Sequence, residues 1–143
     1  MSARGALALT ASLVTLAALA GCSSGSPSGP DPSAPWQYQL TGTLDLSANA
    51  KVFDVDGEGT TKKQVDALHG KGAYVICYMS AGTYEDWRSD ARSIPTSVRG
   101  QPLEDWPGER WLDIRRRDVL LPIMEKRIAA CKDKGFDAVE FDN

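Results

Sequence analysis

Acidic and hydroxyl side chains stand at the ends of four short segments whose composition is typical of β-strands. These residues are Asp54, Asp56, Ser80, Asp113, Glu140 and Asp142. Parallel α/β folds bind their ligands outside the carboxyl ends of their strands. Carboxylates crowded at such an edge raise one another's pKa, and a fold retains them mainly where a ligand or a reaction uses them. We therefore expect these side chains to form a functional site.

The side chains around these carboxylates favour glycoside hydrolysis. That reaction needs two carboxyl groups on either side of the scissile bond, one as acid and one as nucleophile or base. The segments between the strands add aromatic rings and polar groups suited to sugar faces and hydroxyls. They are Tyr78, Tyr84, Trp87, Trp106, Glu85 and Arg88.

Two metal chemistries compete with this interpretation. Residues 54–59 resemble the start of an EF-hand calcium loop, but the twelfth position, which needs a bidentate Glu, is Val65. A magnesium site made only of carboxylates stays open, although no phosphate-binding loop accompanies it. The single histidine, His69, falls near the end of a predicted helix, away from the strand ends. We expect neither a metal nor a cofactor.

Charge and cysteine content narrow the function classes. The net charge is −3, and the only basic run is residues 115–117. This pattern provides no electrostatic footprint for nucleic acid, so we expect none as a partner. Cys77 lies in an apolar segment and Cys131 in a predicted helix, and the spacing leaves open whether they form a disulfide or remain buried thiols.

Hydrophobic periodicity predicts alternating strands and helices. One helix begins at a Thr61-x-x-Gln64 capping box and another spans 118–134, with Pro122 expected in its first turn. The predicted strands are 50–56, 73–79, 110–114 and 136–142. This order predicts right-handed βαβ units, and hence an α/β fold with four parallel strands. Such a sheet is either half of a (β/α)8 TIM barrel or a small open sheet.

The N-terminal segment has the features of an export signal. An arginine near the start precedes a short apolar stretch, and residues 19–22 (Leu-Ala-Gly-Cys) resemble the lipobox of bacterial lipoproteins. We therefore expect residues 1–21 to be a signal peptide and Cys22 to carry a lipid. Residues 22–35, rich in Ser, Gly and Pro, are expected to tether a domain of residues 36–143 to the outside of a membrane.

Three ordered motifs resemble one enzyme family. Residues 78–88 (YMSAGTYEDWR), 106–115 (WPGERWLDIR) and 135–143 (GFDAVEFDN) are similar to motifs of glycoside hydrolase family 114, the endo-α-1,4-polygalactosaminidases. The resemblance implies a secreted (β/α)8 barrel that hydrolyses galactosamine-containing polysaccharide without a metal. An acidic cleft would suit such a polycationic substrate.

The resemblance also assigns roles to individual residues. It implies that Asp142 is a catalytic carboxylate. The implied substrate-binding residues are Asp54, Asp56, Tyr78, Ser80, Glu85, Arg88, Asp113 and Glu140.

The chain departs from the family pattern in two places. Residues 57–59 (Gly-Glu-Gly) replace bulkier residues, and the family's second catalytic carboxylate comes from a later strand than the one ending at Asn143. We expect the chain to be the first half of a barrel. The alternative is a non-catalytic carbohydrate-binding lipoprotein or an inactive truncated fragment.

Overall fold

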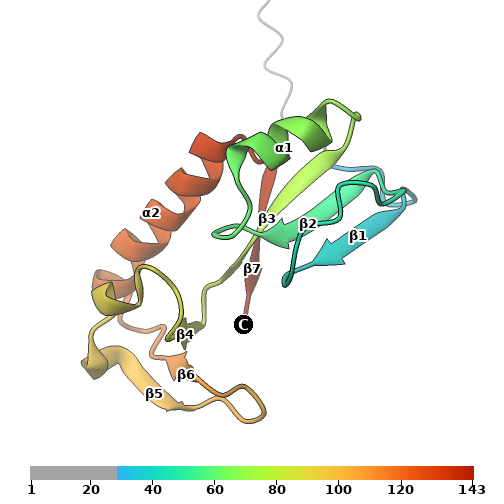
Figure 1. The fold of residues 1–143 in the computed structure, drawn as a ribbon. Coiled ribbons are helices and arrows are strands. Elements are labelled where there is room, and N and C mark those ends of the chain that lie inside the picture. The colour runs from blue at the N-terminus through green and yellow to red at the C-terminus, as the bar shows by residue number, and fades with distance from the viewer. Residues whose placement is uncertain (1–28) are drawn as a thin grey trace, which may run out of the picture.

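The computed structural model describes residues 29–143 and contains two sheets (Figure 1). The predicted signal peptide (residues 1–21) and Cys22, the predicted lipidation site, lie outside the described residues. The larger sheet has four strands in the order β1-β2-β3-β7, and the smaller has three in the order β4-β6-β5. In Figure 1 the smaller sheet lies beyond the end of β7, at the carboxyl end of the larger sheet.

All strands of the larger sheet are parallel, which confirms the predicted α/β class with four parallel strands. Their bounds are β1 (Trp36–Gln39), β2 (Val52–Asp56), β3 (Tyr74–Ser80) and β7 (Ala138–Asp142). The first of these, β1, was not predicted. Its four residues alternate between exposed and half-buried, so it lacks the apolar run that identifies β3.

The predicted parallel strand over residues 110–114 is wrong. This segment contains β6 (Glu109–Leu112), which pairs antiparallel with β4 (Thr83–Glu85) and β5 (Arg99–Pro102). The short 3-10 helices η1 (Ala91–Ser93) and η2 (Thr96–Val98) precede β5. Only the two end residues of β6 are buried, whereas a central parallel strand is covered on both faces.

Helix α1 (Lys62–His69) begins as predicted. The Thr61 side chain accepts a hydrogen bond from the Gln64 backbone N–H, and the Gln64 side chain accepts one from the Thr61 N–H. This reciprocal pair satisfies two backbone donors that the first helical turn leaves free. The capping box is confirmed.

Helix α2 (Arg117–Lys134) ends at Gly135, whose φ of 90° is the left-handed conformation typical of a glycine after a helix. The predicted place of Pro122 in the first turn is wrong, because it is the sixth residue of the helix. Its ring removes one backbone donor at an exposed position, where water can bind the free carbonyl. Leu120, Met124 and Cys131 of α2 are buried, whereas Ile128, which continues the same helical spacing, is 38% exposed.

Both helices pack on the same face of the larger sheet, which we call the outer face. Side chains of β2 and β3, including Phe53, Val55 and Val75, contact Val65 and Leu68 of α1. Further along β3, Cys77 and Met79 contact Cys131 of α2, and a disulfide joins Cys77 to Cys131 with a Cα–Cα distance of 6.1 Å. The structure thereby resolves the open question of these thiols.

The disulfide holds α2 against the sheet at Cys77 of β3.

Neither helix within residues 29–143 is long and apolar enough to cross a membrane.

Candidate functional site

The opposite face of the larger sheet, its inner face, carries most of the predicted site residues. Alternate residues of a strand share a face, and so do residues paired in register on neighbouring strands. Asp56 is in register with Tyr78, Tyr78 with Glu140, and Ser80 with Asp142. The parallel register therefore brings the carboxyl ends of β2, β3 and β7 together, as the sequence predicted.

Tyr78 holds the predicted catalytic carboxylate. Its phenol donates a hydrogen bond of 2.6 Å to Oδ2 of Asp142, and the Tyr78 side chain is 8% exposed. Burial, followed by the bond to Asp142 and its negative charge, raises the pKa of Tyr78 well above its usual value. The phenol therefore remains a hydrogen-bond donor at all ordinary pH values, and it fixes the orientation of the carboxylate.

Asp54 and Glu140 form a second carboxyl pair on the inner face. Burial raises the pKa of Asp54 to about 8, and a hydrogen bond with Glu140 and its charge add to the effect. One oxygen of each carboxyl is buried without a donor from residues 29–143. A proton shared between the two groups satisfies both oxygens, because a protonated carboxyl is itself a donor. Because its pKa is raised to about 8, the Asp54 carboxyl is largely protonated at neutral pH.

Tyr38 of β1 extends the inner face and was not among the predicted site residues. Its ring meets that of Tyr78 edge-on, with centroids 6.4 Å apart, and it is 58% exposed. Burial and the charges of Glu140, Asp54 and Asp142 raise its pKa. The only signal in the sequence was the aromatic alternation of residues 36–39, which is too short to identify a strand by itself.

Arg88 and Glu85 were predicted to contact substrate, but they bind each other. The guanidinium donates to both Glu85 oxygens, at 2.6 and 2.9 Å, and a third N–H binds Asp56. These bonds, outweighing the effect of burial, raise the pKa of Arg88. The bidentate bond to Glu85 is local, and the bond to Asp56 joins the segment after β4 to the end of β2, so Arg88 positions Asp56 and neutralises two acids.

Ser80 begins a buried chain of hydrogen bonds that the sequence did not reveal. Its hydroxyl binds the hydroxyl of Thr83, which donates at 3.0 Å to Glu109. Glu109 is 9% exposed, and burial raises its pKa. This residue lies within the 106–115 motif, but its burial depends on how the small sheet docks against β3.

Asp113 does not stand at the end of a parallel strand, so that part of its prediction is wrong. It follows β6 of the small sheet, and its carboxylate binds Arg115 at 2.6 and 3.0 Å. The side chains of these two residues are 31% and 86% exposed. In this structure the Asp113 carboxylate is paired with a surface arginine, and no contact joins it to the inner-face carboxylates.

The predicted aromatic platforms divide into two groups. Trp87 and Trp106 are 54% and 60% exposed, so their rings are free to meet a sugar face. Tyr84 instead packs against the core cluster of the small sheet and lies under Arg99, whose guanidinium carbon is 3.9 Å from the ring centroid. Tyr84 is therefore a structural residue.

Gly57 has a packing role that explains one departure from the family pattern. A Cβ at this position would lie 2.2 Å from Sγ of Cys77 and 2.9 Å from the carbonyl oxygen of Tyr78. The backbone N–H of Gly57 donates to that carbonyl at 3.0 Å. Only glycine permits the loop after β2 to approach the disulfide this closely.

Comparison with known proteins agrees with this arrangement. The family model of glycoside-hydrolase family GH114 matches residues 17–143. None of the curated proteins matches the chain. The crystal structure of Aspergillus fumigatus Ega3 in complex with galactosamine is similar over 86% of this chain and 49% of its own, with 38% identity and a TM-score of 0.77.

A second solved structure shares the fold. The glycoside hydrolase domain of PelA from Pseudomonas aeruginosa has a TM-score of 0.65 and 14% identity, covering 76% of this chain and 44% of its own. The chain spans about half the length of both solved structures, as the first four strands of a TIM barrel would. The parallel sheet, the ordered motifs and the family match together show that this chain belongs to glycoside-hydrolase family GH114.

Proposed function

We propose that this chain forms half of the catalytic barrel of a glycoside hydrolase that cleaves galactosamine-containing polysaccharide, as an endo-α-1,4-polygalactosaminidase does. The observation that carries the proposal is the position of Asp142, held by Tyr78 at the carboxyl edge of the parallel sheet. The 38% identity to Ega3, whose crystal structure contains galactosamine, supports an amino sugar as the substrate.

In this proposal Asp142 acts on the anomeric carbon or its attacking water, as nucleophile or general base. Tyr78 keeps the reactive oxygen in place, since its hydrogen bond restrains rotation of the carboxylate. A retaining or inverting glycosidase needs a second carboxyl group across the scissile bond. In this family that group comes from a later strand, and residues 29–143 contribute the Asp142 side of the site.

The charge of the inner face supports a cationic polymer as substrate. Asp54, Asp56, Glu140 and Asp142 stand on neighbouring strands, and of these Asp56 is paired with an arginine. Protonated amines of a galactosamine chain would be attracted to the remaining charge. The exposed rings of Trp87 and Trp106 would offer flat surfaces to the sugar units.

The test is hydrolysis of α-1,4-linked galactosamine oligomers, measured by new reducing ends, alongside binding of the same oligomers by calorimetry. In a barrel that carries both this half and the later-strand carboxylate, hydrolysis that disappears in Asp142→Asn, with an unchanged circular dichroism spectrum, supports the proposal. Binding without hydrolysis by that complete barrel favours the non-catalytic carbohydrate-binding alternative. Absence of both would overturn the proposed substrate.

We also propose that the chain is exported and anchored through a lipid on Cys22. The Leu-Ala-Gly-Cys sequence and the polar tether after it support this, and the Cys77–Cys131 disulfide is the kind of bond that persists outside the reducing cytoplasm. Metabolic labelling with radioactive palmitate should mark the wild-type chain but not Cys22→Ser. Equal labelling of the two would contradict the anchor.

A further inference from the structure

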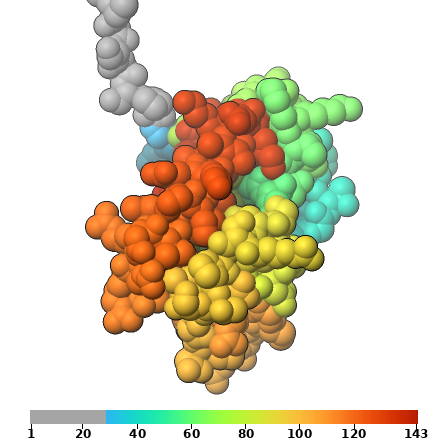
Figure 2. Space-filling view, turned by 90° about the vertical axis from the view of Figure 1, so that its left-hand side faces the viewer, coloured from blue at the N-terminus to red at the C-terminus, as the bar shows by residue number. Residues whose placement is uncertain are grey.

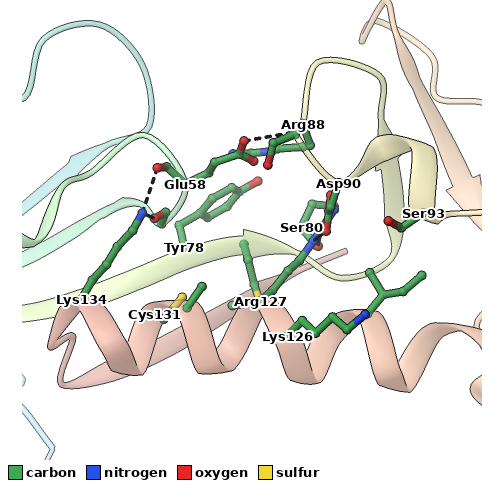
Figure 3. A pocket seen from close by; sticks show the side chains of 15 residues that line it. Glu58, Tyr78, Ser80, Arg88, Asp90, Ser93, Lys126, Arg127, Cys131 and Lys134 are labelled. Carbon is green, nitrogen blue, oxygen red and sulfur yellow. Dashed lines mark hydrogen bonds and ion pairs between the residues drawn. The ribbon is translucent and has the colours of Figure 1, made fainter.

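A cavity of about 350 Å³ lies between β3 and helix α2 (Figure 3). Its lining reaches Tyr78, Ser80 and Arg88 of the inner-face site but includes none of the inner-face carboxylates. It is enclosed by β3, helix α2, the loop after β2 and the segment around η1, all within residues 29–143. Its volume falls within the range of small-molecule sites. In Figure 2, helix α2 (orange to red) and the 88–93 segment (yellow) meet on the face toward the viewer.

The floor of the cavity is apolar. Met79 of β3 and Ile123 of α2 are 5% and 8% exposed, and Ala130 and Cys131 continue this surface along the helix. An apolar group placed there would leave water and contact this surface. The floor therefore suits a hydrocarbon body.

The two acidic residues of the lining each face a donor or a cation. Both oxygens of Asp90 accept hydrogen bonds of 2.7 Å from Arg127. One oxygen of Glu58 accepts from the Ser89 backbone N–H at 2.9 Å, and the other lies 3.9 Å from Arg88. The Asp90 carboxylate is therefore neutralised by Arg127, while Glu58 keeps one oxygen without a hydrogen bond among the described residues.

Two lysines of the lining, in contrast, lack an acidic partner among residues 29–143. The Lys134 ammonium donates to the carbonyls of Gly57 and Glu58, at 2.6 and 2.9 Å, which uses two of its three protons. Lys126 makes no hydrogen bond or ion pair with the other lining residues drawn in Figure 3. Lys126, Ala130 and Lys134 are spaced by four residues, so they follow one side of α2 along the cavity.

We propose that this cavity is a binding site for an anionic amphiphile, a medium-chain carboxylate such as decanoate. The carboxylate binds Lys126 and the hydrocarbon chain lies over Met79 and Ile123. Charge complementarity selects this ligand, because the lining carries four cationic side chains (Arg88, Lys126, Arg127 and Lys134) and two acidic ones (Glu58 and Asp90). This excess of positive charge disfavours the cationic polymer of the proposed function, so a failure to bind decanoate would leave the proposed function unaffected.

Isothermal titration of the disulfide-bonded chain with decanoate, below its micellar concentration, tests the proposal. Decyltrimethylammonium, with the same alkyl length and the opposite charge, is the ligand control. We expect decanoate to bind at one site and Lys126→Glu to weaken it at least tenfold. Lys132→Glu changes the same charge on the same helix outside the cavity lining and is expected to stay within twofold of the wild type.

A second pair of variants tests the apolar floor. Ala130→Phe places a ring at the cavity, whereas Ala129→Phe places the same ring on α2 outside the lining. Only the first should abolish decanoate binding, with both chains folded by circular dichroism. The proposal is overturned if decanoate does not bind. It is also overturned if Lys126→Glu and Lys132→Glu weaken binding equally, or if the decyl cation binds as tightly, which would indicate adsorption on exposed apolar surface.

Discussion

The phenol of Tyr78 and the carboxylate of Asp142 are joined by a hydrogen bond of 2.6 Å across the β3–β7 strand pair. The two residues are 64 positions apart in the sequence. A hydrogen bond to a charged group contributes about 1.5–3 kcal/mol to stability. The relationship therefore both stabilises the sheet edge and orients the proposed catalytic oxygen.

Replacing Tyr78 with Phe removes only the hydroxyl. We expect the free energy of unfolding to fall by about 1.5–3 kcal/mol in urea titration, because the buried side of Asp142 loses its donor. In an active barrel, Tyr78→Phe should lower kcat by a larger factor than it lowers the affinity for substrate. Tyr74→Phe, at the other end of the same strand, is the control. Equal stability of Tyr78→Phe and the wild type would contradict the bond.

Asp54 gives stability a specific pH dependence. Its pKa is about 8 in the folded chain against 3.8 as the ordinary value, so between these limits the folded state holds a proton that the unfolded state releases. The contribution of Asp54 to the free energy of unfolding is therefore fully present below about pH 4, and it is lost as the pH rises toward 8. The melting temperature measured from pH 5 to pH 9 should show this decline.

Asp54→Asn removes the titrating group and should flatten that decline. Asp66→Asn, which changes an exposed helix residue paired with Lys62, should keep it. An unchanged slope in Asp54→Asn would refute the shared proton between Asp54 and Glu140.

Arg88→Met leaves two acids without their cation. The Glu85 side chain is 5% exposed and that of Asp56 19% exposed, so both lose compensation in a poorly solvated place. Breaking such a buried pair costs about 3–5 kcal/mol. Chemical denaturation of Arg88→Met should show this loss, and Arg88→Lys should recover only part of it because an ammonium cannot bind both Glu85 oxygens in parallel.

The surface pair of Arg116 and Asp118 offers the matched control. Their side chains are 45% and 68% exposed, so water screens the pair and Arg116→Met should leave the free energy of unfolding nearly unchanged. Comparable losses in the two arginine variants would show that Arg88 does not hold the site together.

Gly57 lies against the Cys77 sulfur of the disulfide, so substitutions at the two places should not have independent effects on stability. Replacing both Cys77 and Cys131 with Ala opens a loop of 54 residues and should lower stability by roughly 2–4 kcal/mol. Gly57→Ala should cost about 1–3 kcal/mol with the disulfide intact, because the new methyl group overlaps Sγ of Cys77.

The cost of Gly57→Ala should be smaller in the Cys77→Ala/Cys131→Ala background, where the bulky sulfur is gone. Denaturation of all four proteins measures this coupling. Additive effects would contradict it.

Local signals in the sequence determined much of the fold. The capping box at Thr61, the apolar run of β3 and the glycine after α2 each act through nearest neighbours in the chain, so their structures followed from residue type and spacing. The acids at the ends of β2 and β7 were identified for another reason, which is that a parallel sheet brings its carboxyl ends to one edge.

Tertiary packing decided the remaining features. β1 and β6 are short and half-exposed, so only their partners determine which sheet each one joins. The pairing of Arg88 with Glu85 and Asp56, and the burial of Glu109, depend on how the small sheet docks. Sequence by itself determined which residue types stand at the edge of the sheet. Only the folded chain decided which of them neutralise one another and which remain free, because charge pairing depends on distances between segments far apart in sequence.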